Sequence, residues 1–148
     1  MKLLRLGRAN WDVVAICDED GGCPVLDILL TGHREGSKEA RNKMLSLLTQ
    51  SVPFDGPQLE NRTVCKPLEP RSESLYEFRK QPKRGSKPRV VWFFDGEWRI
   101  VCAVAFFKTD RTPEDKLWQA RALRRSYFRA KATGDLQTLE MPARGGRP

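Results

Sequence analysis

Histidine is nearly missing from this chain, since His33 is the single one among 148 residues. Cysteine is scarce too, and the four thiols, at Cys17, Cys23, Cys65 and Cys102, form no CxxC pair. A zinc site needs about four such ligands at close spacing, so we expect neither a metal nor another cofactor. Cys102 lies inside an apolar run, which predicts a buried thiol. Because no disulfide framework is expected, a reducing cytoplasm is the location that the sequence favours.

Long apolar runs and internal repeats are also missing. No stretch approaches the ~20 apolar residues that a membrane-spanning helix needs. The N-terminal sequence MKLLRLGRANWDVV lacks the apolar segment of a signal peptide. The length fits one domain with a modest core. We therefore expect a cytoplasmic protein without a membrane partner.

Positive charge is plentiful but unevenly distributed. The chain has 27 Lys and Arg against 19 Asp and Glu, a net charge of +8. Residues 79–131 hold 15 basic and 5 acidic residues, whereas residues 1–78 hold 10 basic and 12 acidic ones. A structured basic segment favours a polyanion partner, because each phosphate contact releases condensed counterions. The alternative is a solvated surface that serves solubility.

Hydrophobic periodicity predicts an α+β domain. In chain order we expect a strand at 11–17, helices at 23–30 and from Ser37 onward, strands at 64–68, 74–80, 89–94 and 97–107, and a helix after Thr112. This order predicts an antiparallel sheet of about four strands with two N-terminal helices and a C-terminal helix. We assign residues 1–131 to this domain and 132–148, which are rich in Gly and Pro, to a flexible tail.

The Asp95-Gly96 pair between two apolar runs predicts a tight two-residue hairpin turn. Such a turn places Arg89 opposite Cys102 and on the same face as Lys108. Six residues separate Cys102 from Lys108, which is ~20 Å of extended strand. We therefore expect Arg89 and Lys108 to hold different phosphates of a bound nucleic acid.

Four stretches of the chain resemble the RelE/HigB toxins of bacterial type II toxin–antitoxin systems, in their phage-derived HigB-like branch. They are CPVLDILL, SLYEFRK, RVVWFFDGEWRIVCAVAFFK and TPEDKLWQARALRRSYFRA, and together they span about Trp11 to Lys131. The resemblance implies a RelE-like fold and a metal-independent endoribonuclease (mRNA interferase). It also implies that mRNA is cleaved on the ribosome, that growth arrests, and that a cognate antitoxin, of the helix-turn-helix type, neutralises the toxin.

The same resemblance names candidate catalytic residues. Arg79 matches the arginine that ends the first meander strand, Arg89 the one that opens the next, and Lys108 the basic residue after the last strand. Tyr76 and Glu77 match the strand motif. The chain departs from many relatives because one basic residue, not two, follows the last strand. It departs also because His33 lies far away in an expected turn and Tyr127 lies in the middle of the expected last helix, so neither matches the His or Tyr that serves the cleavage site in many relatives.

Cations at these positions suit RNA cleavage without a metal. The ribose 2′-hydroxyl attacks the adjacent phosphate, and fixed guanidinium or ammonium groups stabilise the extra negative charge of the transition state. Lys108 is a candidate general base if neighbouring cations lower its pKa, and Glu77 is a second candidate. Further expected RNA contacts are Lys80, Lys83, Arg84, Lys87, Arg121, Arg125 and Arg129.

Less specific interpretations remain for these residues. The basic side chains at strand ends could be ordinary solvated charges, Tyr76 could be a core residue, and the arginines at 121, 125 and 129 could form a solvated helix face. At the level of function, one alternative is a non-catalytic nucleic-acid-binding module or decayed toxin. The other is a subunit whose basic face binds an acidic protein.

Overall fold

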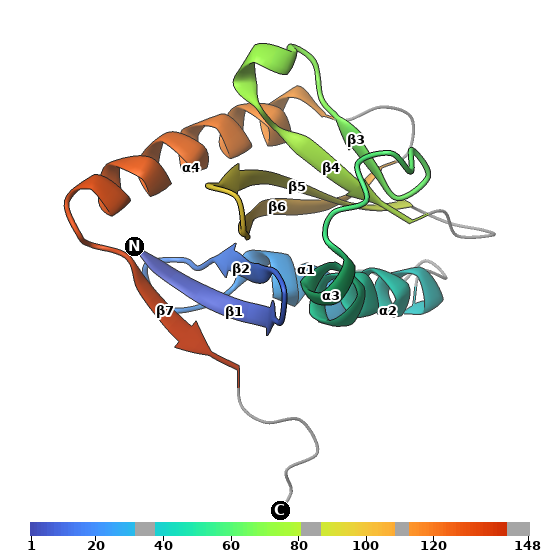
Figure 1. Ribbon diagram of the computed structural model, residues 1–148, viewed down its shortest axis with the longest axis horizontal. Helices are drawn as coiled ribbons and strands as arrows, with labels where there is room; N and C mark the ends of the chain where they lie inside the picture. The colour runs from blue at the N-terminus through green and yellow to red at the C-terminus, as the bar shows by residue number, and fades with distance from the viewer. Residues whose placement is uncertain (32–37, 81–86, 109–112, 142–148) are drawn as a thin grey trace, which may run out of the picture.

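The computed structural model describes residues 1–31, 38–80, 87–108 and 113–141, and its strands form one mixed sheet (Figure 1). The seven strands are β1 Lys2–Arg8, β2 Asp12–Ile16, β3 Cys65–Pro67, β4 Tyr76–Arg79, β5 Lys87–Asp95, β6 Arg99–Lys108 and β7 Gln137–Glu140. Their order across the sheet is β3-β4-β5-β6-β2-β1-β7. Neighbours are antiparallel except for β2 with β6 and β1 with β7, which are parallel.

The expectation of an antiparallel, RelE-like sheet of about four strands is therefore wrong. The meander β3 to β6 is present, but β2 joins β6 in parallel and β1 adds a further strand that the sequence did not reveal. The predicted flexible tail also contains an ordered element. Strand β7 pairs with β1 from Lys2 opposite Gln137 to Arg5 opposite Glu140, so the sheet extends beyond residue 131.

Helices cover both faces of the sheet (Figure 1). One face carries α1 Pro24–Thr31, α2 Lys38–Ser46, the π-helical turn η1 Leu47–Ser51 and α3 Val52–Asp55, and the other carries α4 Glu114–Ala132. A short 3₁₀ turn, η2 Arg71–Glu73, precedes β4. Four apolar residues of α2 and η1 form the buried stripe of this layer, namely Ala40, Met44, Leu47 and Leu48.

Side chains of the central strands alternate between these two layers. Val90 and Trp92 of β5 pack toward α1 and α2, whereas Val91 and Phe93 pack toward α4. Cys102 is fully buried, as its apolar surroundings predicted. Both faces of β5 and β6 are thus covered, which explains why these strands read as nearly continuous apolar runs.

The hairpin between β5 and β6 differs from the prediction in its turn and in its register. Its turn has three residues, 96–98, and Asp95 pairs with Arg99. The longer turn moves the partner of Arg89 from Cys102 to Ala105, and a register shift of one residue between Val91 and Trp92 moves it on to Phe106. Together these changes bring Arg89 close to the end of β6.

A network of charges holds the C-terminal end of α4 against the sheet. Tyr127 and Lys131 of α4 both donate hydrogen bonds to Asp95. Arg99 donates its Nε to Asp12 Oδ2 at 3.0 Å. Burial and the bond to Asp95 raise the pKa of Tyr127 to about 12, so its hydroxyl remains protonated at neutral pH. The full network comprises Arg5, Asp12, Asp95, Arg99, Tyr127, Lys131 and Glu140.

Gly7 allows β1 to pass close to the helical layer. A Cβ atom added there would lie 2.6 Å from Pro53 Cγ and 2.8 Å from the backbone oxygen of Thr49. Both contacts are shorter than side chains tolerate, and the second involves backbone that cannot rotate away. The contact fixes the position of β1 against Thr49 of η1 and Pro53 of α3.

Gly7→Ala should lower the free energy of unfolding by about 1–3 kcal/mol, because it overpacks this contact. Urea denaturation followed by circular dichroism measures the change. Gly22→Ala is the matched control, since its Cβ would lie 3.5 Å from the nearest atom and its φ is not positive. Equal stability of the Gly7 variant and wild type would contradict the predicted clash.

Candidate functional site

A group of basic side chains lies on the α4 face of the sheet, where β6 ends before the chain enters α4. We call it the cationic cluster. It consists of five cations around one carboxylate, namely Lys66, Arg79, Lys87, Arg89 and Lys108 around Glu77. Four adjacent strands, β3 to β6, supply these residues.

Strand register brings the cluster together. Lys66 pairs with Glu77 across β3 and β4, and Arg79 pairs with Arg89 across β4 and β5. Lys87 pairs with Lys108 across β5 and β6. Paired residues point to the same face of a sheet, and so do residues two apart along a strand. All six side chains therefore project toward the layer that contains α4.

Glu77 and Arg89 form the buried centre of the cluster, and neither is exposed to solvent. Arg89 Nε lies 3.5 Å from Glu77 Oε1, and Arg79 Nε lies 3.7 Å from the same oxygen. Arg89 also donates Nη1 to the carbonyl oxygens of Lys80, at 3.0 Å, and Pro88, at 2.8 Å. A buried guanidinium needs such partners, because leaving water removes its hydration.

The remaining cations are accessible. The Arg79 side chain is 20% exposed and donates Nη1 to the carbonyl oxygen of Arg62 at 3.1 Å. Lys66, Lys87 and Lys108 are half-buried. A ligand could thus touch Arg79 and the three lysines. The buried Glu77–Arg89 pair holds these groups in place rather than contacting the ligand.

Lys108 has the electrostatic environment of a candidate base. Burial lowers the pKa of its ammonium below the ordinary 10.5. Glu77 opposes this shift, while Lys66, Arg89 and Arg79 lower the pKa further. Like charges disfavour the protonated form, so the neutral amine of Lys108 is populated at a lower pH than that of an ordinary lysine.

The cationic cluster and the charged network at the C-terminal end of α4 differ in charge balance. The network around Asp95 and Arg99 contains three cations and three carboxylates. The cationic cluster, on the same face, contains five cations and one carboxylate. Uncompensated like charges held close together are unfavourable in an unliganded protein. The excess therefore points to an anionic ligand at the cluster.

Four of the five predicted catalytic residues meet in this cluster, namely Glu77, Arg79, Arg89 and Lys108. Tyr76 does not, because it projects to the opposite face. Its ring stacks on Trp92 with the ring centroids 4.8 Å apart and meets Phe94 edge-on at 5.3 Å. Tyr76 is thus a packing residue in this structure. The expected separation of Arg89 and Lys108 is also wrong, since Phe106, the partner of Arg89, is two residues from Lys108.

The predicted RNA-binding residues divide among several surfaces. Lys87 belongs to the cluster, and Lys80 lies beside it with its side chain toward α2. Arg121 is paired with Glu73 at 2.7 Å. The other two arginines of the predicted stripe, 125 and 129, are exposed on α4. Lys83 and Arg84, which were also predicted to bind RNA, lie outside the described residues, as does His33.

Lys66 was missed by the sequence-based interpretation. Its strand was expected, but the side chain becomes meaningful only when β3 is aligned with β4 and Lys66 falls opposite Glu77. The alternation of side chains within residues 64–68 could have indicated the face of Lys66, since it places Lys66 on the face opposite Cys65. Pro67 interrupts this alternation, so the short strand gave too few residues to assign the face.

Other kinds of site find no support in the described parts of the chain. Those residues contain no group of three or more His, Cys, Asp or Glu side chains that could hold a metal ion. No helix among them is long and apolar enough to cross a membrane.

The buried Glu77–Arg89 pair should behave as a coupled unit. Glu77→Leu alone should destabilise the protein by about 3–5 kcal/mol, because it leaves Arg89 buried without its carboxylate. The double variant Glu77→Leu/Arg89→Met should recover most of this loss. A double-mutant cycle by urea denaturation measures the coupling, and additive losses would contradict it.

Neither comparison with known proteins identifies a relative. No protein-family model matches the chain, and no curated protein matches it significantly.

Proposed function

We propose that the protein is a metal-independent endoribonuclease that cleaves single-stranded RNA at the cationic cluster. The observation that carries the proposal is the excess of five cations over one carboxylate in the cationic cluster. Two further features support it. Both Arg79 and Lys108 are accessible, and the pKa of Lys108 is lowered, chiefly by burial.

The accessible cations suit the chemistry of a phosphodiester. Attack by the 2′-hydroxyl forms a 2′,3′-cyclic phosphate and breaks the bond from phosphorus to the 5′ oxygen. The guanidinium of Arg79 can bind two phosphoryl oxygens at once, because its planar fork matches their geometry. Lys66 and Lys87 add positive charge on either side, which stabilises the developing dianion.

Lys108 is the proposed general base. In its neutral form the amine accepts the proton of the 2′-hydroxyl as the oxygen attacks, and the leaving 5′ oxygen takes a proton from solvent. A base of this kind contributes about 10²–10⁴ to the rate. Glu77 is less suited to this role, because it is buried and lies beside Arg79 and Arg89.

The biological setting is also a proposal. The stretches that resemble RelE/HigB toxins correspond largely to α1, β4, β5, β6 and α4. These stretches contain four of the six cluster residues, all except Lys66 and Lys87. On this basis we propose that the RNA is mRNA on the ribosome, that the activity arrests growth, and that an antitoxin neutralises it. The proposal rests on these elements and on their charges, not on the architecture of the whole sheet.

Lys108→Arg should separate charge from proton transfer. Arginine retains the positive charge but does not deprotonate, so RNA binding should persist while cleavage falls by about 10²-fold or more. Wild-type cleavage should rise with pH and level off below pH 10.5, because only the neutral amine accepts a proton. The assay follows a 5′-labelled RNA in EDTA and identifies the 2′,3′-cyclic phosphate product.

Lys2→Ala is the control in this assay, since Lys2 is exposed on β1, away from the cluster. RNA that binds wild-type protein and remains intact both with and without added ribosomes would contradict the proposed enzyme and leave a non-catalytic RNA-binding module. Cleavage that requires added Mg²⁺ would contradict the metal-independent mechanism.

Induced expression in bacteria should arrest growth and create new mRNA 5′ ends. The same induction of Lys108→Arg should give neither effect at equal protein level, because this variant keeps the fold and the charge. Growth curves and mapping of RNA ends measure both outcomes. Arrest by Lys108→Arg without new ends would show that the protein acts by binding alone.

A further inference from the structure

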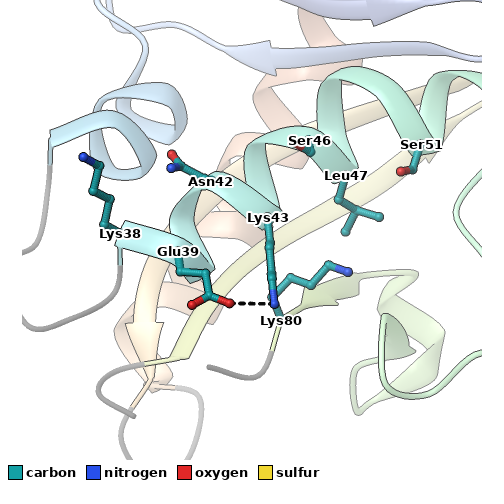
Figure 2. Close-up of a pocket in the computed structure, with 8 residues that line it drawn as sticks. All are labelled: Lys38, Glu39, Asn42, Lys43, Ser46, Leu47, Ser51 and Lys80. Atoms are coloured by element: carbon teal, nitrogen blue, oxygen red, sulfur yellow. Dashed lines mark ion pairs between the residues drawn. The ribbon is translucent and has the colours of Figure 1, made fainter. Parts of the chain in front are cut away.

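A second basic surface lies on the other side of the sheet from the cationic cluster. It is an open groove of about 710 Å³ between α2, with the following turn η1, and the end of β4 (Figure 2). Lys38, Lys43 and Lys80 supply three ammonium groups to its lining. We call it the α2 groove.

The lining of the α2 groove is polar. Glu39 forms an ion pair with Lys43 at 2.9 Å, drawn as a dashed line in Figure 2, so the lining keeps a net positive charge. Asn42 and Ser46 add groups that can donate hydrogen bonds. A groove of this kind suits a chain of phosphates better than an apolar ligand.

The end of β4 connects the α2 groove to the cationic cluster. Arg79 and Lys80 are consecutive, and their side chains point to opposite faces of the sheet. The carbonyl oxygen of Lys80 accepts the 3.0 Å hydrogen bond from the buried Arg89. The backbone between the two surfaces is therefore fixed by a residue of the cluster itself.

We propose that the α2 groove binds the single strand of RNA that continues from the cluster around the end of β4. Arg79 and Lys108 would hold the phosphate at the cleavage site, and Lys80 and Lys38 would hold phosphates farther along the strand. A single strand can follow this bend, whereas a stiff duplex cannot. The inference deepens the proposed function, and it rests on RNA as the ligand of the cluster.

The test measures binding without cleavage. The probe is a fluorescein-labelled 2′-O-methyl RNA of about 12 nucleotides, which lacks the attacking hydroxyl. Its binding to the full-length protein is followed by fluorescence anisotropy at several salt concentrations. The test variant is Lys38→Ala/Lys80→Ala, which leaves the Glu39–Lys43 pair and the Lys80 carbonyl in place. Lys2→Ala/Arg8→Ala removes the same charge from two exposed positions of β1 and is the control.

The test variant should bind the probe about tenfold more weakly than wild type, with a salt slope smaller by about 1.4, because two phosphate contacts are lost. The control variant should bind like wild type. Equal weakening in both variants would overturn the inference, since net charge alone would then explain the loss. Tighter binding of polyglutamate than of RNA, lost in the test variant, would also overturn it in favour of an acidic protein.

The outcomes keep this inference distinct from the proposed nuclease. Cleavage of ordinary RNA with no effect of the test variant on binding would overturn the groove alone. Binding that depends on Lys38 and Lys80, with no cleavage of ordinary RNA, would overturn the nuclease and support the groove. Failure of the wild-type protein to bind the probe at all would overturn both.

Discussion

The buried carboxylate of Glu77 is the charge on which the arrangement of the candidate site depends. It lies in β4, contacts Arg79 and Arg89, and among the residues that the structure describes it is the carboxylate of a cluster with five cations. Without it, Arg89 would be a buried cation among like charges, a situation that proteins avoid by changing either the fold or the protonation state. Glu77 thereby allows basic residues of four strands to remain close together before a ligand binds. Fewer side chains then have to be ordered on binding, which lowers its entropic cost.

The charged network at the C-terminal end of α4 provides a comparison for the cationic cluster. There, alternating acidic and basic side chains around Asp95 and Asp12 satisfy one another and tie the helix to the hairpin and to β2. That arrangement needs nothing from outside the protein. Because the network at the C-terminal end of α4 is satisfied by internal pairs, the excess charge of the cationic cluster stands out as a feature that fold stability does not require.

The sequence predicted three of the helices and the meander strands, because these depend on local periodicity. It placed Cys102 on the face of Arg89 and Lys108, whereas Cys102 packs on the opposite face, toward α1 and α2. It did not predict β1, β7 or the parallel pairing of β2 with β6. Leucines at 3, 4 and 6 do not alternate, since the register shifts between Arg5 and Gly7, and the β7 sequence QTLE is short and half exposed. The shift near Trp92 was also hidden, because an unbroken apolar run gives no alternation to fix the register. That one shift decides whether Arg89 and Lys108 share a site.

Strand β7 forms the edge of the sheet next to β1, although among the described strands β1 is synthesised first and β7 last. During synthesis, β1 can pair with β2 early, but its other edge keeps unpaired backbone groups until the final strand arrives. Open strand edges are the sites at which chains join one another, and contacts between distant parts of a chain form slowly. Until β7 docks, the seven-residue edge of β1 is open to neighbouring chains, and afterwards the exposed edge is the four-residue strand β7.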